Sequence, residues 1–313
     1  MSVSCVVSGA EEEATGLDVD LAKTFRFCEG NRFTLKQMHE LLPALSPKVA
    51  AVEKRWNAAF GKAEANVEAR LKSITGGEWP EIREALRNKV IEVLRRENEK
   101  SRSEKRALAY LELTERRIRG ELDSPVREML LASHPDFVAE PALEFSRGYT
   151  QSFETEGKEN AKGVKLSLKL PASWKARETK AADAVQKWVS DAGYGFESVT
   201  LLVRDVSEIP APPGGLFVEE FARKLVTDGG LEFKGFSSAE VAKKPLGTVH
   251  FRHVAEQEKP LTLRGSLHYF VHGDKFVELR LTCGTASGAE NSEERIKRLQ
   301  ELMKLVVGSV VLG

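Results

Sequence analysis

The sequence predicts an α+β fold in which an all-helical N-terminal domain is followed by a mainly antiparallel α/β/α sandwich. Apolar side chains recur at helical spacing through residues 34–149. From Val164 onward, the clearest segments instead alternate between apolar and polar residues, as strands with one buried face do. Between these regions lies Glu154–Lys162, a polar stretch that we interpret as a linker.

Length and charge restrict the possible classes of protein. A chain of 313 residues is long enough for about two domains with a core each. Its 47 basic side chains balance its 47 acidic ones, so no field over the whole molecule attracts nucleic acid or an anionic membrane. No apolar run of about 18 residues is present, so no transmembrane helix is expected. We therefore expect a helical domain at 21–153, the linker at 154–162 and an α/β domain at 163–313.

The first twenty residues precede both domains. Residues 1–10 are small and mostly apolar, and the acidic run Glu11–Glu13 follows them. This pattern resembles the end of a secretory signal whose charged start is missing, which predicts an extracytoplasmic location. A disordered terminus explains the same residues, and it is the interpretation that we weight more strongly for this segment.

The strongest helical pattern runs from Ser46 to Ile74. Ser46-Pro47 opens it with proline at the first helical position, and Gly76-Gly77 ends it. One face carries an apolar stripe formed by Val49, Val52, Trp56, Ala59/Phe60, Ala63, Val67 and Leu71. Upstream, Thr34 is a good N-cap and predicts the start of the first helix, whereas residues 21–33 indicate no definite element.

The next helix starts at Trp79-Pro80, and its apolar face is formed by Ile82, Leu86, Val90, Val93 and Leu94. Arg95–Arg106 then contains no apolar side chain before the stripe resumes. Either one long helix has a solvated middle, or a helical hairpin turns near Asn98–Ser103. We favour the hairpin, because a solvated middle buries nothing. Further helices are expected from Ser124-Pro125 to Leu131 and over Pro135–Tyr149.

The α/β domain begins with its clearest strand. Val164, Leu166, Leu168 and Leu170 alternate with polar residues, and Pro171 removes a donor and ends the strand. Trp174 follows as a large ring placed to close one end of a core. We predict that the sheet is built on this strand, with Pro171 and Trp174 in structural positions.

The rest of the domain is expected to contain two strands, a helix, three strands and a terminal helix. Their ranges, in that order, are Ala184–Ser190, Val199–Val206, Phe217–Leu225, Thr248–Ala255, Leu261–His272, Lys275–Cys283 and Glu290–Val307. His272-Gly273-Asp274-Lys275 is typical of a tight hairpin turn, so it joins the last two strands. The terminal helix is amphipathic and covers one face of the sheet.

Several of these features together resemble the PsbP/DcrB-type α/β/α sandwich, over about Gly163–Gly313. They are the strand ending in LPASW, the IPAPPGG loop at Ile209–Gly215 before a helix, the antiparallel strands, and the terminal helix with its Val-rich tail. That group includes the PsbP subunit of photosystem II and the Ran-binding Mog proteins. The resemblance implies a binding or scaffold module that works through protein contacts. It implies no catalytic set, and it carries over Pro171 and Trp174 alone.

Four histidines lie on the predicted strands, at positions 250, 253, 268 and 272. Alternation places at most three of them on one face, and His250 and His268 are expected to be several residues out of register. Zinc requires ligand nitrogens about 2 Å from one point, so no metal site is predicted. Polar-face histidines are the main interpretation, and a pH-sensitive surface is the alternative.

The three cysteines, Cys5, Cys28 and Cys283, share no metal-ligand spacing. We interpret them as buried or free thiols, with a Cys28–Cys283 disulfide as the alternative. No G-x-S-x-G, H-E-x-x-H or P-loop motif is present. The prediction is therefore that the protein has no catalytic, cofactor-binding or metal-binding residues and no cofactor.

These observations lead us to expect a non-enzymatic binding or assembly module, located outside the cytoplasm, that acts through protein contacts. An intracellular protein-binding adaptor and an enzyme with an unrecognised site are the alternatives. The expected partner is an unknown protein or a second copy, bound through helices 46–74 and 81–119, unless their stripes pack on each other within the chain. In 81–119 the signs of charge alternate and no aromatic side chain interrupts the charged run, so nucleic acid is not expected.

Overall fold

The computed structural model describes residues 16–313 except 101–102, 123, 180, 182, 211–214, 256–260 and 286–291. Contacts between Cα atoms divide the chain into two units, Met1–Glu115 and Arg116–Gly313. The first unit is helical, and the second contains two antiparallel sheets with helices. The predicted α+β class is therefore confirmed. None of the helices in the described part of the chain has the length and apolarity that a bilayer-spanning segment needs.

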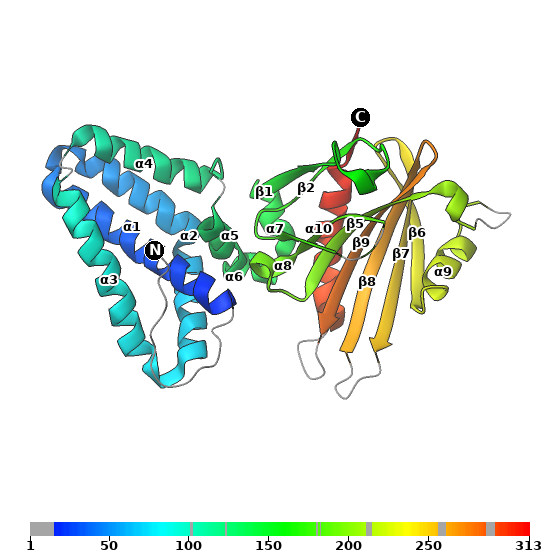
Figure 1. Cartoon of the computed structure of the whole chain (residues 1–313), viewed down its shortest axis with the longest axis horizontal. Coiled ribbons are helices and arrows are strands. Elements are labelled where there is room, and N and C mark those ends of the chain that lie inside the picture. Colours follow the sequence, from blue (N-terminus) through cyan, green and yellow to red (C-terminus); the bar gives the residue numbers. More distant parts are fainter. Residues whose placement is uncertain are drawn as a thin grey trace. The chain divides into compact units, whose positions relative to one another are not determined.

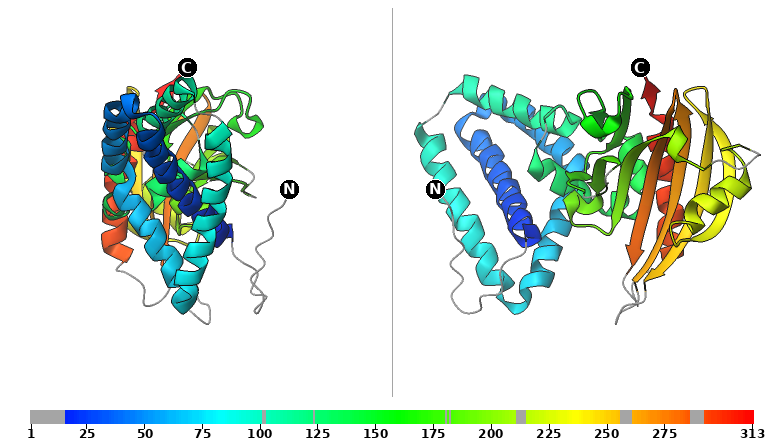
Figure 2. Two further views of the ribbon diagram at one scale, coloured as in Figure 1. Left: turned by 90° about the vertical axis from the view of Figure 1, so that its left-hand side faces the viewer. Right: turned by 45° about the vertical axis from the view of Figure 1, so that its right-hand side comes forward.

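The first unit is formed by α1 (Gly16–Leu41), α2 (Ser46–Thr75), α3 (Trp79–Lys100) and most of α4 (Glu104–Arg119), with 3-10 turns at Pro43–Leu45 and Gly76–Glu78. Figures 1 and 2 show α3 and α4 diverging from the break between them. Residues 79–119 thus form two helices, as we favoured, although they do not lie alongside each other as a closed hairpin would. The turn predicted at Asn98–Ser103 lies partly outside the described residues.

Helix α1 begins earlier than the sequence indicated. It runs without a break through the residues left unassigned, so the prediction that the first helix starts at Thr34 is wrong. Its buried side chains Leu21, Phe25, Cys28 and Leu35 recur every three to seven residues and form one helical face. Polar residues between them obscured this period. The residues before Gly16, including those of the predicted export signal and Cys5, lie outside the described residues.

The second unit contains short and long helices and two sheets. The helices are α5 (Pro125–Ala132), α6 (Pro135–Ala139), α7 (Pro141–Ser146), α8 (Ser190–Gly193), α9 (Glu219–Thr227) and α10 (Ser292–Gly308). The strands are β1 (Thr150–Glu154), β2 (Leu166–Pro171), β3 (Lys175–Arg177), β4 (Ala184–Val189), β5 (Glu197–Asp205), β6 (Glu232–Val241), β7 (Lys244–Ala255), β8 (Leu261–His272), β9 (Lys275–Thr285) and β10 (Val311–Leu312). The helix predicted over Pro135–Tyr149 is instead divided into α6 and α7, because Pro141 starts a new helix.

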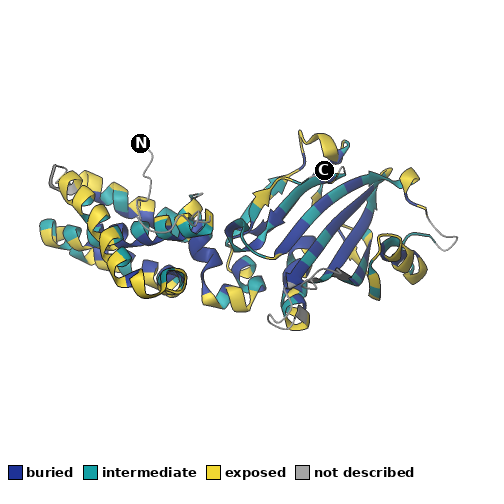
Figure 3. Cartoon of the chain, turned by 60° about the horizontal axis from the view of Figure 1, so that its bottom comes forward, coloured by how far each residue is buried: buried dark blue, intermediate teal, exposed yellow. Residues whose placement is uncertain are grey.

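A seven-stranded antiparallel sheet in the order β3-β4-β5-β9-β8-β7-β6 is the centre of this unit. One face packs against α10 and a three-stranded sheet, β1-β2-β10, around a core that includes Leu168, Leu279 and Met303. The other face packs against α9, where Phe221 contacts Tyr269 and Phe276. Figure 3 shows the resulting buried bands along the strands of the large sheet.

The LPASW strand has a different place from the one predicted. It is β2, the middle strand of the small sheet, so the large sheet is not built on it. The predicted linker also differs: Glu154 ends β1, and Thr155 and Ala161 are buried inside the second unit. The hydroxyl of Thr155 donates to the Val164 carbonyl at 2.6 Å, which attaches this polar segment to the sheet. The polar residues 154–162 therefore form a structured connection within the second unit and do not mark the boundary between the two units.

Candidate functional site

The helical unit has one helix whose apolar stripe is only partly covered. In α3, Trp79 is the single buried side chain among the described residues 79–97. Val90 and Leu94 pack against α1 where Gly30 allows close approach: a Cβ on that glycine would lie 3.0 Å from Leu94. The rest of the stripe stays half-buried, and Val93 is 57% exposed.

The stripe of α2 is used inside the chain. All of its predicted members apart from Ala59 are buried, namely Val49, Val52, Trp56, Phe60, Ala63, Val67 and Leu71. The stripe of α2 therefore packs within the chain, which was the alternative to its binding a partner protein. Because α2 has no stripe left to offer, α3 is the better candidate for a contact with another protein.

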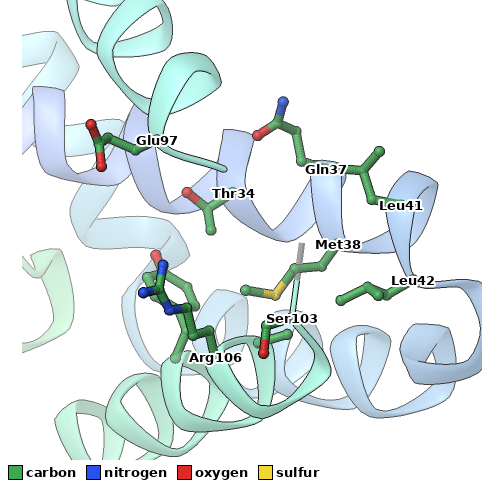
Figure 4. Close-up of a pocket in the computed structure, with 10 residues that line it drawn as sticks. Thr34, Gln37, Met38, Leu41, Leu42, Glu97, Ser103 and Arg106 are labelled. Carbon is green, nitrogen blue, oxygen red and sulfur yellow. The ribbon is translucent and has the colours of Figure 1, made fainter. Parts of the chain in front are cut away.

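A pocket of about 250 Å³ lies between α1, the end of α3 and α4 (Figure 4). Met38, Leu41, Leu42 and Ala107 give it an apolar side, and its remaining lining residues are Thr34, Gln37, Glu97, Ser103, Arg106 and Tyr110. Its volume is below the roughly 300–1,000 Å³ of pockets that enclose whole small-molecule ligands. The pocket is suited to a single side chain of a bound protein, with polar groups at its rim.

Buried charges connect the first three helices. Glu29 of α1 and Glu64 of α2 are both buried; Arg32 contacts both carboxylates, and its bond to Glu64 is 2.6 Å long. Arg87 of α3 lies 3.3 Å from Glu29, and the indole N–H of Trp56 donates to Glu64 at 2.6 Å. Each carboxylate is thus neutralised by an arginine, so the cluster is structural rather than a free acid–base pair.

Both described cysteines are buried, and the alternative Cys28–Cys283 disulfide is not formed. Burial, followed by the charge of nearby Glu64, raises the pKa of the Cys28 thiol well above its ordinary value. A thiol with a raised pKa stays protonated at neutral pH and is a poor nucleophile.

In the large sheet His250 lies near His268, because it pairs with Ser266, two residues away from His268 in the strand, and not several as predicted. The ring nitrogens of His268 lie 3.1 Å from the Thr248 hydroxyl and 2.9 Å from the Ser266 hydroxyl. Burial, and then the charge of His250, lower the pKa of His268 to about 4, so it stays neutral near pH 7. His250 contacts Gln300 of α10 instead. Among the described residues, no group of three His, Cys, Asp or Glu side chains is arranged for a metal ion.

The structure places the two predicted structural residues together at the end of β2. Pro171 is the last residue of the strand, and its carbonyl accepts a hydrogen bond from the Gln151 amide at 2.9 Å. Trp174 is 4% exposed and lies in the core between the sheets with Trp188.

A buried carboxyl beside these residues was missed by the sequence analysis. Glu144 of α7 accepts hydrogen bonds from the Ser173 amide at 2.8 Å and the Ser173 hydroxyl at 2.6 Å. No sequence signal distinguishes it from the exposed glutamates near it, because its partner lies 29 residues away.

No protein-family description and no curated protein matches this chain in sequence. Solved structures similar to its C-terminal half include cyanobacterial PsbP (CyanoP) from Synechocystis sp. PCC 6803, with 13% identity, a TM-score of 0.37, and coverage of 53% of this chain and 93% of that one. The Saccharomyces cerevisiae Ran-binding protein Mog1p has 14% identity, a TM-score of 0.35, and coverage of 52% and 95%. LpqN, involved in cell envelope biogenesis of Mycobacterium tuberculosis, has 11% identity, a TM-score of 0.33, and coverage of 52% and 91%.

PsbP and Mog proteins belong to the group that the LPASW strand and the element order resemble. These likenesses concern the fold of the C-terminal half alone. The α+β class of the second unit follows from its own helices and antiparallel sheets.

Proposed function

We propose that this protein is a non-enzymatic binding or assembly module whose helical unit binds a partner protein through α3. The partly covered apolar stripe of α3 carries the proposal. Ile82, Leu86 and Val93 are four and seven residues apart, which is the spacing of anchor residues in helix-to-helix recognition. Val90, between them, packs against α1. The partner that fits is an amphipathic helix, because a helix presents apolar side chains at the same spacing.

The neighbouring pocket supports the same proposal. It lies at the end of α3 and accepts one side chain, so a helix docked along α3 would have a site for an additional anchor. Two titratable groups with strongly shifted pKa values, Glu144 and His268, are buried and hydrogen-bonded within the second unit. This favours binding over catalysis, with an enzyme as the alternative.

The proposed contact is tested with Val93→Glu. Val93 is more than half exposed, so the substitution should leave the fold stable while placing a charge in the contact. Arg95→Glu is the matched control, since it lies on the same helix about half a turn away from the stripe and is exposed. Crosslinking of the full chain in its native host, followed by mass spectrometry, should recover a protein with the wild type and with Arg95→Glu, but not with Val93→Glu.

Sedimentation velocity of the purified chain decides whether that partner is a second copy. A wild-type dimer that Val93→Glu converts to monomer supports self-association through α3. If Val93→Glu recovers the same proteins as the wild type and leaves the oligomeric state unchanged, α3 is not the contact surface.

An extracytoplasmic location is part of the proposal, and it is supported by the signal-like pattern of residues 1–10. Fractionation of host cells expressing the native gene tests it. Recovery with cytoplasmic proteins would favour the intracellular adaptor instead.

A further inference from the structure

One face of the seven-stranded sheet is covered by α9 over only part of its width. Helix α9 packs on β6 and β7, and its Phe221 extends to Tyr269 and Phe276. On β3, β4 and β5 the same face carries a mixture of apolar and polar side chains, and its cations Lys175, Arg177, Lys187 and Arg204 are exposed or half-buried. This part of the sheet is a separate surface from the α3 stripe.

The strand register brings cations on this face into one row. Arg177 pairs with Lys187, Lys187 pairs with Thr200, and Thr200 pairs with Arg280, across β3, β4, β5 and β9. Directly paired residues of antiparallel strands lie on the same face. The sequence gives no sign of this row, because its members are up to 103 positions apart (280 − 177).

The rows on either side of this one contain further cations and hydroxyl groups. Lys175 pairs with Val189 and Val189 with Ser198, whose hydroxyl lies 2.7 Å from that of Thr282. On the other side, beyond the row of Leu202 and Glu278, Arg204 pairs with Phe276. Together, five cations form what we call the cationic face: Lys175, Arg177, Lys187, Arg204 and Arg280.

The carboxylate within this surface does not cancel its charge. Glu278 is fully buried and contacts both Arg204, at 2.9 Å, and Arg280, at 2.6 Å. Two guanidinium groups share one carboxylate. No ion pair of Lys187 or Arg177 with any other described residue is found. Five cations against one carboxylate leave a local excess of four positive charges.

The dimensions of the row match an extended acidic chain. Three strand spacings of about 4.8 Å place the Cα atoms of Arg177 and Arg280 roughly 14 Å apart. In an extended peptide, side chains on one side recur about every 6.7 Å, so acidic residues at alternate positions i, i+2 and i+4 span about 13 Å.

One aromatic ring lies beside the row, but it is not an open stacking surface: the Arg177 guanidinium lies over the Tyr194 ring, 5.6 Å from its centroid, and donates to the Gly193 carbonyl at 3.1 Å. The hydroxyl of Tyr269 donates to the Leu216 carbonyl beside α9, and the guanidinium of Arg204 lies over the Phe276 ring. Single-stranded nucleic acid is usually bound on aromatic platforms that stack with its bases. Hydroxyl groups and guanidinium groups are instead suited to carboxylates.

We propose that the cationic face binds an acidic segment of a partner protein, held in an extended conformation with carboxylates at alternate positions. The binding is electrostatic and screened by salt. The proposed peptide binding involves only the second unit, so it is tested independently of the α3 contact.

The test uses fluorescein-labelled peptides of alternating Glu and Ser, with alternating Gln and Ser as the neutral control. Fluorescence anisotropy with the full-length protein should show binding of the Glu peptide alone, weakened at least tenfold when salt rises from about 0.05 M to about 0.3 M. The variant is Arg177→Gln with Lys187→Gln, because neither side chain holds Glu278. We expect about three- to tenfold weaker binding, as exposed ion pairs contribute modestly.

The matched control is Lys169→Gln with Lys243→Gln, which removes the same charge from exposed sites off this face. Control binding should equal wild type, and so should that of Val93→Glu, which separates this proposal from the α3 contact. Equal loss in both double variants, or equal binding of the Gln peptide, would overturn it. Tighter binding of an oligothymidine of the same charge than of the Glu peptide would overturn it in favour of nucleic acid.

Discussion

At the scale of single residues, Glu144 has the most informative environment. Burial raises the pKa of its carboxyl from the ordinary 4.5 to about 7, against the opposing effects of the Ser173 hydrogen bonds and the Arg127 charge. The folded state therefore binds this proton more tightly than the unfolded state does. The resulting stabilisation is fully present below pH 4.5 and is lost as pH rises through about 7, and it amounts to about 3 kcal/mol.

Glu144→Gln should remove this pH dependence. The amide cannot ionise, so the free energy of unfolding of the second unit should fall less steeply between about pH 5 and pH 8 than in the wild type. Urea unfolding at several pH values measures this. Glu140→Gln, an exposed position just before α7, is the control and should keep the wild-type slope. A Glu144→Gln variant with the wild-type slope would contradict the assignment.

Sequence patterns located some of the important residues and missed others for a physical reason. Trp174 follows a strand with clear alternation, so its place at the end of a core was predictable from local spacing. Glu144 and Glu278 are buried carboxyl groups, and each depends on partners far along the chain: Ser173 for the first, Arg204 for the second. From the sequence alone, a glutamate is expected to be exposed to solvent. Only the register of the strands or the packing of the helices, which the sequence does not show, determines that these two side chains are buried.

At the scale of elements, the β6–β7 and β8–β9 hairpins show how far a turn sequence helps to predict a pair of strands. The β8–β9 turn carries Gly273 at φ 64, and its Gly-Asp sequence predicted it correctly. The β6–β7 turn uses Ala242 at φ 47 and Lys243 at φ 62, which are two successive left-handed residues without the usual Asn or Gly. Strand β6 was missed because nothing in Ala-Lys indicates a turn, and its side chains are mostly exposed.

Replacing Ala242 by Asn and Lys243 by Gly should therefore stabilise the second unit. Both new residues tolerate positive φ, so the strain of the turn is relieved, and the expected gain is about 1 kcal/mol. Thermal unfolding should show a rise of about 2–4 °C for a unit of this size. Gly273→Ala is the reciprocal control and should lower stability by about 1 kcal/mol. An unchanged or lower melting temperature for the double variant would mean that the turn is not strained.

In helix α1, packing against other helices stabilises a helix that the helix propensities of its residues do not predict. Its buried face includes Cys28 and Gly30 as well as Leu21 and Phe25. A glycine in the middle of a helix costs up to about 1 kcal/mol and weakens any helical prediction. Here Gly30 lets Leu94 of α3 approach closely, so the packing offsets that cost.

At the scale of the whole molecule, each unit has a tryptophan that reports on its own core. Trp56 lies in the helical unit, where its indole donates to Glu64, and Trp174 lies between the two sheets of the second unit. Both are 4% exposed. Truncating a buried aromatic side chain costs about 3–5 kcal/mol, so Trp174→Ala should destabilise the second unit by that amount.

We expect the loss to be local to the altered unit, since proteins open in cooperative parts that need not coincide with the whole chain. Hydrogen exchange of the full-length Trp174→Ala protein should show faster exchange in β4, β5 and β9, with α1 and α2 at the wild-type rate. Trp56→Ala is the matched variant, and it should reverse the pattern by leaving Glu64 without its indole partner. Equal acceleration of exchange in both units for either variant would show that the chain unfolds as one cooperative body. A variant that destabilises one unit would then also unfold the binding surface proposed on the other.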